Sequence, residues 1–182
     1  MGLFSKQNIP DKEPAPEFIT VGQIVNTHGV RGEMKVQPWD VSAEQFCKFK
    51  TLYIDGTPVR PTARRVQGEM VLMTLPTVET MDEAAAMKTK LVDIRRSEVR
   101  LPDGQYFDAE LVGMHVYEYF PRRFVGVVEE VQSYPAHKLY KVRGESKCYL
   151  IPAVENIFIV DIDERKREIY VNMMEGLACD ED

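Results

Sequence analysis

Apolar and polar residues alternate in short runs along most of the chain, a pattern typical of half-buried β-strands. Two runs lie between residues 18 and 36 and are joined by the glycine-bearing connection Thr27–Gly32. Asp55-Gly56 and Gln67-Gly68 separate later runs and suit tight turns that need a residue at positive φ. The pattern predicts further strands over residues 52–54, 59–66, 70–75 and 91–94.

One helix interrupts the strands of the first half. Thr80 can accept a hydrogen bond from a free backbone amide while Glu83 reaches back, so residues 80–83 predict a capping box and a short helix through Met87. The periodic pattern stops at residues 100–104, where proline and Asp-Gly predict a linker over residues 101–105.

The second half repeats the short strands with almost no helix. The runs are each about five or six residues long and cover residues 111–117, 124–131, 139–142, 148–151, 157–162 and 168–171. Closing such a sheet into a barrel removes its exposed edges. We therefore expect an all-β protein of two small β-barrel domains in tandem, over residues 18–100 and 106–182, with a short helix near the end of the first.

The first 17 residues fit neither barrel. They contain three prolines and little apolar sequence, so they do not resemble a secretory signal, and Lys6 stands where N-myristoylation needs Ser or Thr. We expect residues 1–17 to be a flexible N-terminal tail. No run reaches the ~18 uncharged apolar residues that a membrane span needs.

The three cysteines, Cys47, Cys148 and Cys179, are far apart and form no CxxC motif. Their odd number and wide spacing favour free thiols in a reducing compartment, without a disulfide or a zinc site. The predicted localisation is cytoplasmic.

The net charge of −6 is unevenly distributed. Residues 1–100 contain 14 Lys and Arg against 13 Asp and Glu, a net charge of +1, whereas residues 101–182 contain 9 against 16, a net charge of −7. Since phosphate binding depends on clustered cations, the second half should repel bare RNA and attract a basic protein.

The connection Thr27–Gly32 has two interpretations. The simpler one is a hairpin loop whose glycines relieve backbone strain. The functional one places His28 and Arg31 near RNA, with Arg31 and the loop amides binding a phosphate. No GxGxxG or GxSxG motif accompanies the loop, so neither dinucleotide binding nor hydrolase chemistry is predicted.

Tyr106 and Phe107 follow the linker directly. Adjacent residues of an extended segment point to opposite sides, so one ring can anchor the linker while the other faces outward. Both rings could instead fill the core. If the pair binds a protein partner, replacing both with alanine should weaken that binding and leave the fold intact; a stability loss of about 3 to 5 kcal/mol would indicate core packing.

No catalytic residue, cofactor or metal is expected. The histidines are isolated from one another and from the cysteines, so metal-ligand spacing is absent. His115 lies in an apolar run and is expected to be packed and hydrogen-bonded rather than to act as a general base. Neighbouring carboxylates such as Glu129 and Glu130 fit a solvated face better than glycosidase chemistry.

The segment Val21–Val36, VGQIVNTHGVRGEMKV, closely resembles the opening of the RimM family of ribosome maturation factors. Tyr106 and Phe107 fall where that family usually has two tyrosines. Other similar segments follow in the same order: Thr80–Met87, Glu110–Met114, Leu150–Pro152 and Glu175–Leu177. The similarity spans residues 18–177.

This resemblance implies a six-stranded N-terminal barrel akin to the second domain of translation factors, followed by a C-terminal PRC-type barrel. It implies a non-enzymatic chaperone that binds the immature small ribosomal subunit and assists head assembly and small-subunit rRNA processing. The implied partner of the C-terminal barrel is the basic small-subunit ribosomal protein numbered nineteen, with rRNA near the N-terminal barrel. No membrane or small-molecule partner is implied.

Three positions depart from the family pattern. Phe107 lacks the second tyrosine's hydroxyl, Asp108 stands where tryptophan is common, and Ala153 where phenylalanine is common. Two other functions remain open: a small RNA-binding module without a protein partner, which steep salt dependence would favour, and a nucleotide or flavin enzyme, although the chain has no phosphate-binding loop.

Overall fold

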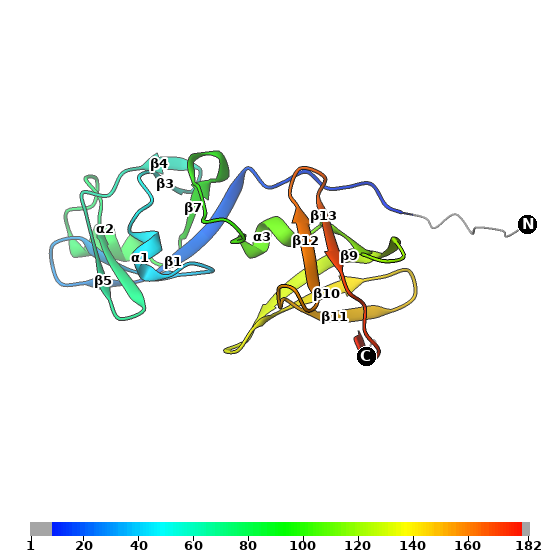
Figure 1. The fold of residues 1–182 in the computed structure, drawn as a ribbon. Coiled ribbons are helices and arrows are strands. Elements are labelled where there is room, and N and C mark those ends of the chain that lie inside the picture. The colour runs from blue at the N-terminus through cyan, green and yellow to red at the C-terminus, as the bar shows by residue number, and fades with distance from the viewer. Residues whose placement is uncertain (1–8, 180–182) are drawn as a thin grey trace, which may run out of the picture. The chain divides into compact units, whose positions relative to one another are not determined.

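The computed structural model describes residues 9–179, which fold into two compact units (Figure 1). The N-terminal unit comprises residues 16–105, and the C-terminal unit comprises residues 106–179 together with residues 9–15. The division between Gln105 and Tyr106 lies at the end of the linker that the sequence predicts.

The N-terminal unit is a seven-stranded sheet that curves into a half-barrel, with the strand order β4-β3-β7-β1-β2-β6-β5. Its strands are β1 Phe18–His28, β2 Glu33–Pro38, β3 Leu52–Ile54, β4 Thr57–Val59, β5 Ala63–Gln67, β6 Met70–Thr74 and β7 Leu91–Arg95. Its helices are α1 Ala43–Phe46, α2 Met81–Ala86 and the 3₁₀ turn η1 Arg96–Glu98. The all-β class is confirmed, but the resemblance implied six strands where the sheet has seven.

The prediction of a single strand over residues 59–66 is wrong, because two separate strands, β4 and β5, cover this part of the chain. Pro61 lacks a backbone N–H and cannot continue a hydrogen-bonded ladder, so the chain leaves the sheet after β4 and re-enters as β5. The ladder resumes at Thr62, whose amide donates to the carbonyl of Thr74 at 2.9 Å. Strands β4 and β5 thereby become the two edges of the sheet.

Alternation along β1 builds the core of this unit. Ile19, Val21 and Ile24 are buried, and Gly22 allows the strand to approach β2 closely, since an added Cβ would lie 2.7 Å from the carbonyl oxygen of Gln37. The predicted helix is also confirmed. Its capping box is complete in α2, because Thr80 Oγ1 accepts from the Glu83 amide at 3.2 Å and the Glu83 carboxylate accepts from the Thr80 amide at 3.0 Å.

The C-terminal unit is also a seven-stranded sheet, ordered β12-β13-β8-β9-β10-β11-β14. Its strands are β8 His115–Glu118, β9 Arg123–Ser133, β10 Lys138–Arg143, β11 Cys148–Pro152, β12 Ile159–Asp163, β13 Glu168–Val171 and β14 Ala178–Cys179. The pairing of β13 with β8 is parallel and the others are antiparallel. Its core is formed mainly by Leu111, Met114, Val116, Val128, Tyr140, Val142, Ile151, Ile169 and Val171.

A helix replaces the start of the strand expected over residues 111–117. Helix α3, Asp108–Leu111, forms because the Glu110 carboxylate accepts a hydrogen bond from the Phe107 amide at 3.2 Å and so closes the first turn. Gly113, at φ +79°, then redirects the chain, and β8 begins only at His115. An apolar run alone does not distinguish these two outcomes.

Residues 9–15 lie against the C-terminal unit, in contrast to the flexible tail expected over residues 1–17 (Figure 1). Lys12 Nζ lies 2.7 Å from the buried carboxylate of Glu168 and 2.7 Å from the Lys166 carbonyl oxygen. Arg167 Nε donates to the Glu13 carbonyl at 3.2 Å. These polar contacts leave no periodic signal in the sequence, and the part of the expected tail over residues 1–8 lies outside the described residues.

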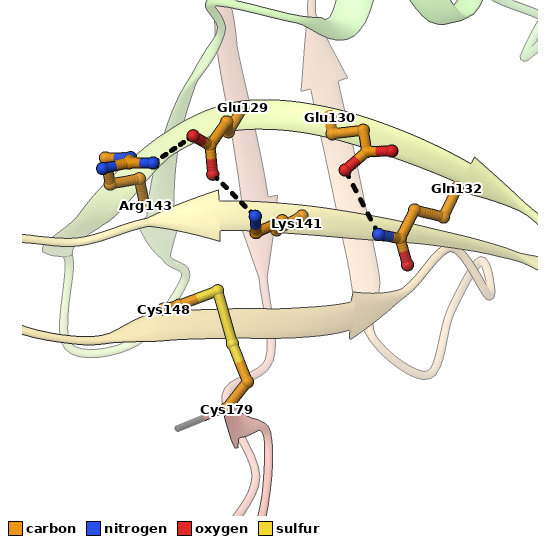
Figure 2. Close-up of a disulfide and its surroundings, with 7 residues drawn as sticks. All are labelled: Glu129, Glu130, Gln132, Lys141, Arg143, Cys148 and Cys179. Carbon is orange, nitrogen blue, oxygen red and sulfur yellow. Dashed lines mark hydrogen bonds and ion pairs between the residues drawn. A yellow bond between two sulfur atoms is a disulfide. The ribbon is translucent and has the colours of Figure 1, made fainter. Parts of the chain in front are cut away.

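Cys148 and Cys179 form a disulfide that ties β14 to β11, so the expectation of free thiols at these positions is wrong (Figure 2). The two residues face each other in the antiparallel register, with Cα atoms 5.3 Å apart. Their sequence separation of 31 conceals this proximity, which only the pairing of β11 with β14 creates. Cys47 is a free thiol.

Candidate partner-binding surfaces

The connection between β1 and β2 has a fixed shape. Gly29 and Gly32 adopt φ values of +67° and +71°, in the left-handed region that other residues avoid. At Gly32 an added Cβ would also collide with the backbone of Val78, which packs under the loop. The strain-relieving role expected for these glycines is therefore present.

Two side chains of this loop, one apolar and one cationic, are exposed to solvent. Val30 is 75% exposed and Arg31 is exposed beside it. Arg31 has no ion pair among residues 9–179. His28 Nε2 lies 3.8 Å from the Glu33 carboxylate, which also pairs with Arg65 at 2.9 Å. Arg31 is thus the cation of this loop that is available to an external anion.

Phe107 is a buried residue of the C-terminal unit. Its side chain is 1% exposed and is among the largest fully buried side chains of the protein. Of the two interpretations that the sequence leaves open for Phe107, the structure therefore favours core packing, because a ring this inaccessible cannot touch a partner while the unit stays folded.

Tyr106 differs from its neighbour. It is half-buried and packs against the hydrophobic core of the C-terminal unit, leaving part of the ring accessible. Burial raises the pKa of the Tyr106 hydroxyl, and the negative charges of nearby carboxylates raise that pKa further; the carboxylates belong to Glu164, Asp161, Glu155 and Glu110. The phenol consequently remains a neutral hydrogen-bond donor in a negative field.

The first three of these carboxylates form an acidic rim, which we define as Glu155, Asp161 and Glu164. All three are exposed, and none has an ion pair among the described residues. The rim is contributed by the turn before β12, by β12 itself and by the turn after it. An accessible aromatic ring beside unpaired carboxylates suits a basic protein partner.

Other acidic positions are neutralised within the unit. Glu129 on β9 forms ion pairs with Lys141, at 3.2 Å, and with Arg143, both on β10 (Figure 2). The hydrogen bonds from Arg143 and Lys141 lower the pKa of the Glu129 carboxyl. Glu130 accepts from Gln132 at 3.2 Å and stays exposed. The excess negative charge of the second half is therefore more available at the rim than on this strand pair.

His115 is buried, as expected, and is 1% exposed. Neither ring nitrogen makes a hydrogen bond of good geometry in the part of the chain that the structure describes, although the Asp11 backbone lies close enough to oppose part of the shift in pKa. Burial lowers the pKa of His115, and the positive charge of Lys12 lowers it further. Phe124 packs against the ring at 5.3 Å between centroids. A neutral, enclosed imidazole fits a packing role.

Two positions that depart from the family pattern have structural roles. Asp108 accepts from Lys138 Nζ at 2.6 Å, and Ala153 packs against the core of the C-terminal unit. Within residues 9–179, no group of three or more His, Cys, Asp or Glu side chains is placed to hold a metal ion. No described helix is long and apolar enough to cross a membrane.

The fold and these surfaces define a two-domain all-β protein whose candidate sites are suited to binding macromolecules. Residues 19–99 match the model of the RimM N-terminal domain, and residues 108–177 match that of the RimM PRC barrel domain. The chain therefore belongs to the RimM family, whose curated members are named ribosome maturation factors.

Related sequences cover nearly the whole chain. A ribosome maturation factor RimM of Clostridium botulinum is 32% identical over 90% of this chain and 99% of its own length. One from Clostridioides difficile is 35% identical over 85% and 93%, and one from Symbiobacterium thermophilum is 32% identical over 91% and 97%. The solved structure of a Pseudomonas aeruginosa 16S ribosomal RNA processing protein RimM is 21% identical over 86% and 98%, with a TM-score of 0.43.

Proposed function

We propose that this protein is a non-enzymatic, cytoplasmic chaperone of small-subunit maturation whose C-terminal unit binds a basic ribosomal protein. The observation that carries the proposal is the partly exposed Tyr106 ring beside the unpaired acidic rim. The partner that the family resemblance implies is the small-subunit ribosomal protein numbered nineteen, a protein of the subunit head. Its positive charge complements the rim.

The aromatic ring and the rim contribute differently to this binding. A buried aromatic anchor supplies much of the energy of a protein interface, whereas charges at its edge mainly accelerate association and exclude wrong partners. Charge attraction acts within a Debye length of about 8 Å at physiological ionic strength. The rim therefore steers the basic protein toward Tyr106, which then holds it.

Maturation follows from differential affinity rather than from a chemical step. A chaperone that binds an assembly intermediate more tightly than the finished particle favours the intermediate and dissociates as the mature contacts form. In this proposal the protein joins the immature small subunit, supports head assembly and small-subunit rRNA processing, and then leaves. Equal capture of immature and mature subunits by the immobilised protein would refute this step.

The rim is tested by measuring the affinity of the full chain for the purified basic ribosomal protein. The test variant carries Glu155→Gln, Asp161→Asn and Glu164→Gln. A matched control neutralises three other exposed carboxylates of the same unit, Glu130, Glu145 and Glu175. We expect the rim variant to lose about tenfold in affinity at low salt, mostly through slower association, and less at high salt. Equal losses of affinity in both variants would refute the proposed role of the rim in binding the basic protein.

Near the N-terminal unit, we propose that His28 and Arg31 lie close to rRNA in the complex. The support is that Arg31 is exposed and has no internal ion pair in the described chain. Should the protein bind naked rRNA with steep salt dependence and ignore the basic protein, the alternative of an RNA-binding module without a protein partner would replace the main proposal.

A further inference from the structure

A groove of about 760 Å³ lies within the N-terminal unit. Three segments form its walls: residues 42–51 around α1, Arg60 after β4, and residues 98–105, which begin at the last residue of η1. The loop of His28 and Arg31 takes no part in its lining, so the groove is a separate feature of the unit.

Four cations line this groove: Lys48, Lys50, Arg60 and Arg100. All four are exposed, and none has a salt bridge within the described residues. Elsewhere in the unit, by contrast, Arg65, Lys90 and Arg95 each pair with a carboxylate at 2.9 to 3.5 Å. Four unpaired cations thus share one groove in a protein whose net charge is −6, whereas other unpaired cations of the unit, such as Arg31 and Lys88, lie outside it.

The two carboxylates of the groove do not cancel these charges. Glu98 is engaged by the Tyr53 hydroxyl, which donates to it at 2.9 Å. Glu44 lies near Lys48, whose charge contributes to a lowered pKa of the Glu44 carboxyl, after hydrogen bonds from its own backbone and from Ser42. Four cations against two carboxylates leave the groove positive.

The walls of the groove are held in place by the core of the unit. Phe49 is 5% exposed and packs edge-on against the ring of Phe46. The Arg64 guanidinium donates to the Phe49 carbonyl, and Arg96 donates to the Val99 carbonyl at 2.8 Å. The backbone next to Lys48, Lys50 and Arg100 is therefore preorganised, which reduces the entropy lost on binding.

We propose that this cationic groove binds the sugar-phosphate backbone of RNA. Lys and Arg supply most protein contacts to phosphates, and polar side chains such as those of Gln45 and Gln105 can add hydrogen bonds to the ribose or phosphate. The lining lacks an accessible aromatic anchor of the kind that dominates protein interfaces, because Phe49, its one aromatic residue, is buried. Contacts of this kind position an RNA without reading its sequence.

The test measures binding of the full-length protein to a fluorescent fragment of small-subunit rRNA over a salt series. Two double variants remove charge from the groove, Lys48→Gln with Arg60→Gln and Lys50→Gln with Arg100→Gln. The matched control, Lys88→Gln with Arg165→Gln, removes the same charge from exposed, unpaired positions outside it. Fluorescence of Trp39, the single tryptophan, verifies that the N-terminal unit stays folded.

We expect each groove variant to bind the RNA about tenfold more weakly at low salt and to lose about 1.5 from the slope of log K against log salt, while the control stays within twofold. Equal losses in groove and control variants would overturn the proposal, as would an unchanged slope. Selective loss of binding to a polyglutamate peptide, with RNA binding retained, would also overturn it. Binding of the basic ribosomal protein to the same variants tests the proposed function separately, and we expect it to be unchanged.

Discussion

Replacing Phe107 with alanine should destabilise the C-terminal unit selectively. The Phe107 side chain is 1% exposed and lies directly before α3, so its removal leaves a cavity that its neighbours can close only in part. Truncating a buried phenylalanine costs about 3 to 5 kcal/mol. In a unit of this size, such a loss should lower the melting temperature by at least about 12 °C.

The chain offers a separate spectroscopic probe for each unit. Its single tryptophan, Trp39, lies in the N-terminal unit, while seven of the eight tyrosines follow residue 105. Urea unfolding followed by tyrosine near-UV circular dichroism should therefore report the C-terminal unit, and Trp39 fluorescence should report the N-terminal one. We expect Phe107→Ala to shift the first transition and leave the second unchanged.

Tyr134→Ala, at a residue that is 53% exposed, provides the control for aromatic truncation. Tyr106→Ala should cost less stability than Phe107→Ala, because Tyr106 is only half-buried, yet it should weaken binding to the basic protein by at least about tenfold. The reasoning fails if Phe107→Ala unfolds no more readily than Tyr134→Ala. Replacing both aromatics together cannot separate the two roles, because Phe107 alone should disturb the fold.

Two further predictions concern the same unit. Reducing the Cys148–Cys179 disulfide with dithiothreitol should lower the free energy of unfolding of the C-terminal unit by about 3 to 4 kcal/mol, the loop-closure value for a separation of 31 residues. The stability of the Cys179→Ser variant should not respond to the reductant. An unchanged urea midpoint of the reduced wild type would contradict the prediction. The pKa of His115 is lower in the folded protein than in the unfolded chain, so as the pH falls the unfolded chain binds a proton before the folded protein does. The contribution of His115 to the free energy of unfolding should therefore be complete above about pH 6.5. Below that pH it should decline by at most about 1.4 kcal/mol per pH unit. His115→Leu should flatten that decline, and the exposed control His137→Gln should not.

Strands that alternate strictly were predictable because one face of each must be buried. Along β1 the apolar residues Ile19, Val21 and Ile24 are buried, whereas Phe18 at the start of the strand is exposed and Val25 is half-buried. The capping box at Thr80 was predictable for a similar reason, since both of its hydrogen bonds lie within four consecutive residues. Local rules of this kind need no knowledge of the tertiary fold.

The features that the sequence did not predict depend on contacts between distant segments. The disulfide exists only because β14 returns beside β11. The start of α3 depends on one hydrogen bond, which the Phe107 amide donates to the Glu110 carboxylate. Without that hydrogen bond, the apolar run fits a strand equally well. Tyr106 could be proposed as a partner-binding residue from its position after the linker. The acidic rim beside it could not, because only the fold of the turns flanking β12 brings those residues to the ring.

Although the net charge of the chain is −6, the protein has two surfaces of opposite charge. The acidic rim belongs to the C-terminal unit and the cationic groove to the N-terminal unit. Surfaces of this kind suit a protein that handles a basic ribosomal protein and rRNA together, because these two partners attract one another strongly and can associate prematurely. Under the proposed function, carboxylates at the rim would compete with rRNA phosphates for the basic protein, while the groove would bind RNA backbone. Once the rRNA reaches its mature arrangement, its many phosphates would outcompete three carboxylates, and the electrostatics that recruited the basic protein would then favour its release.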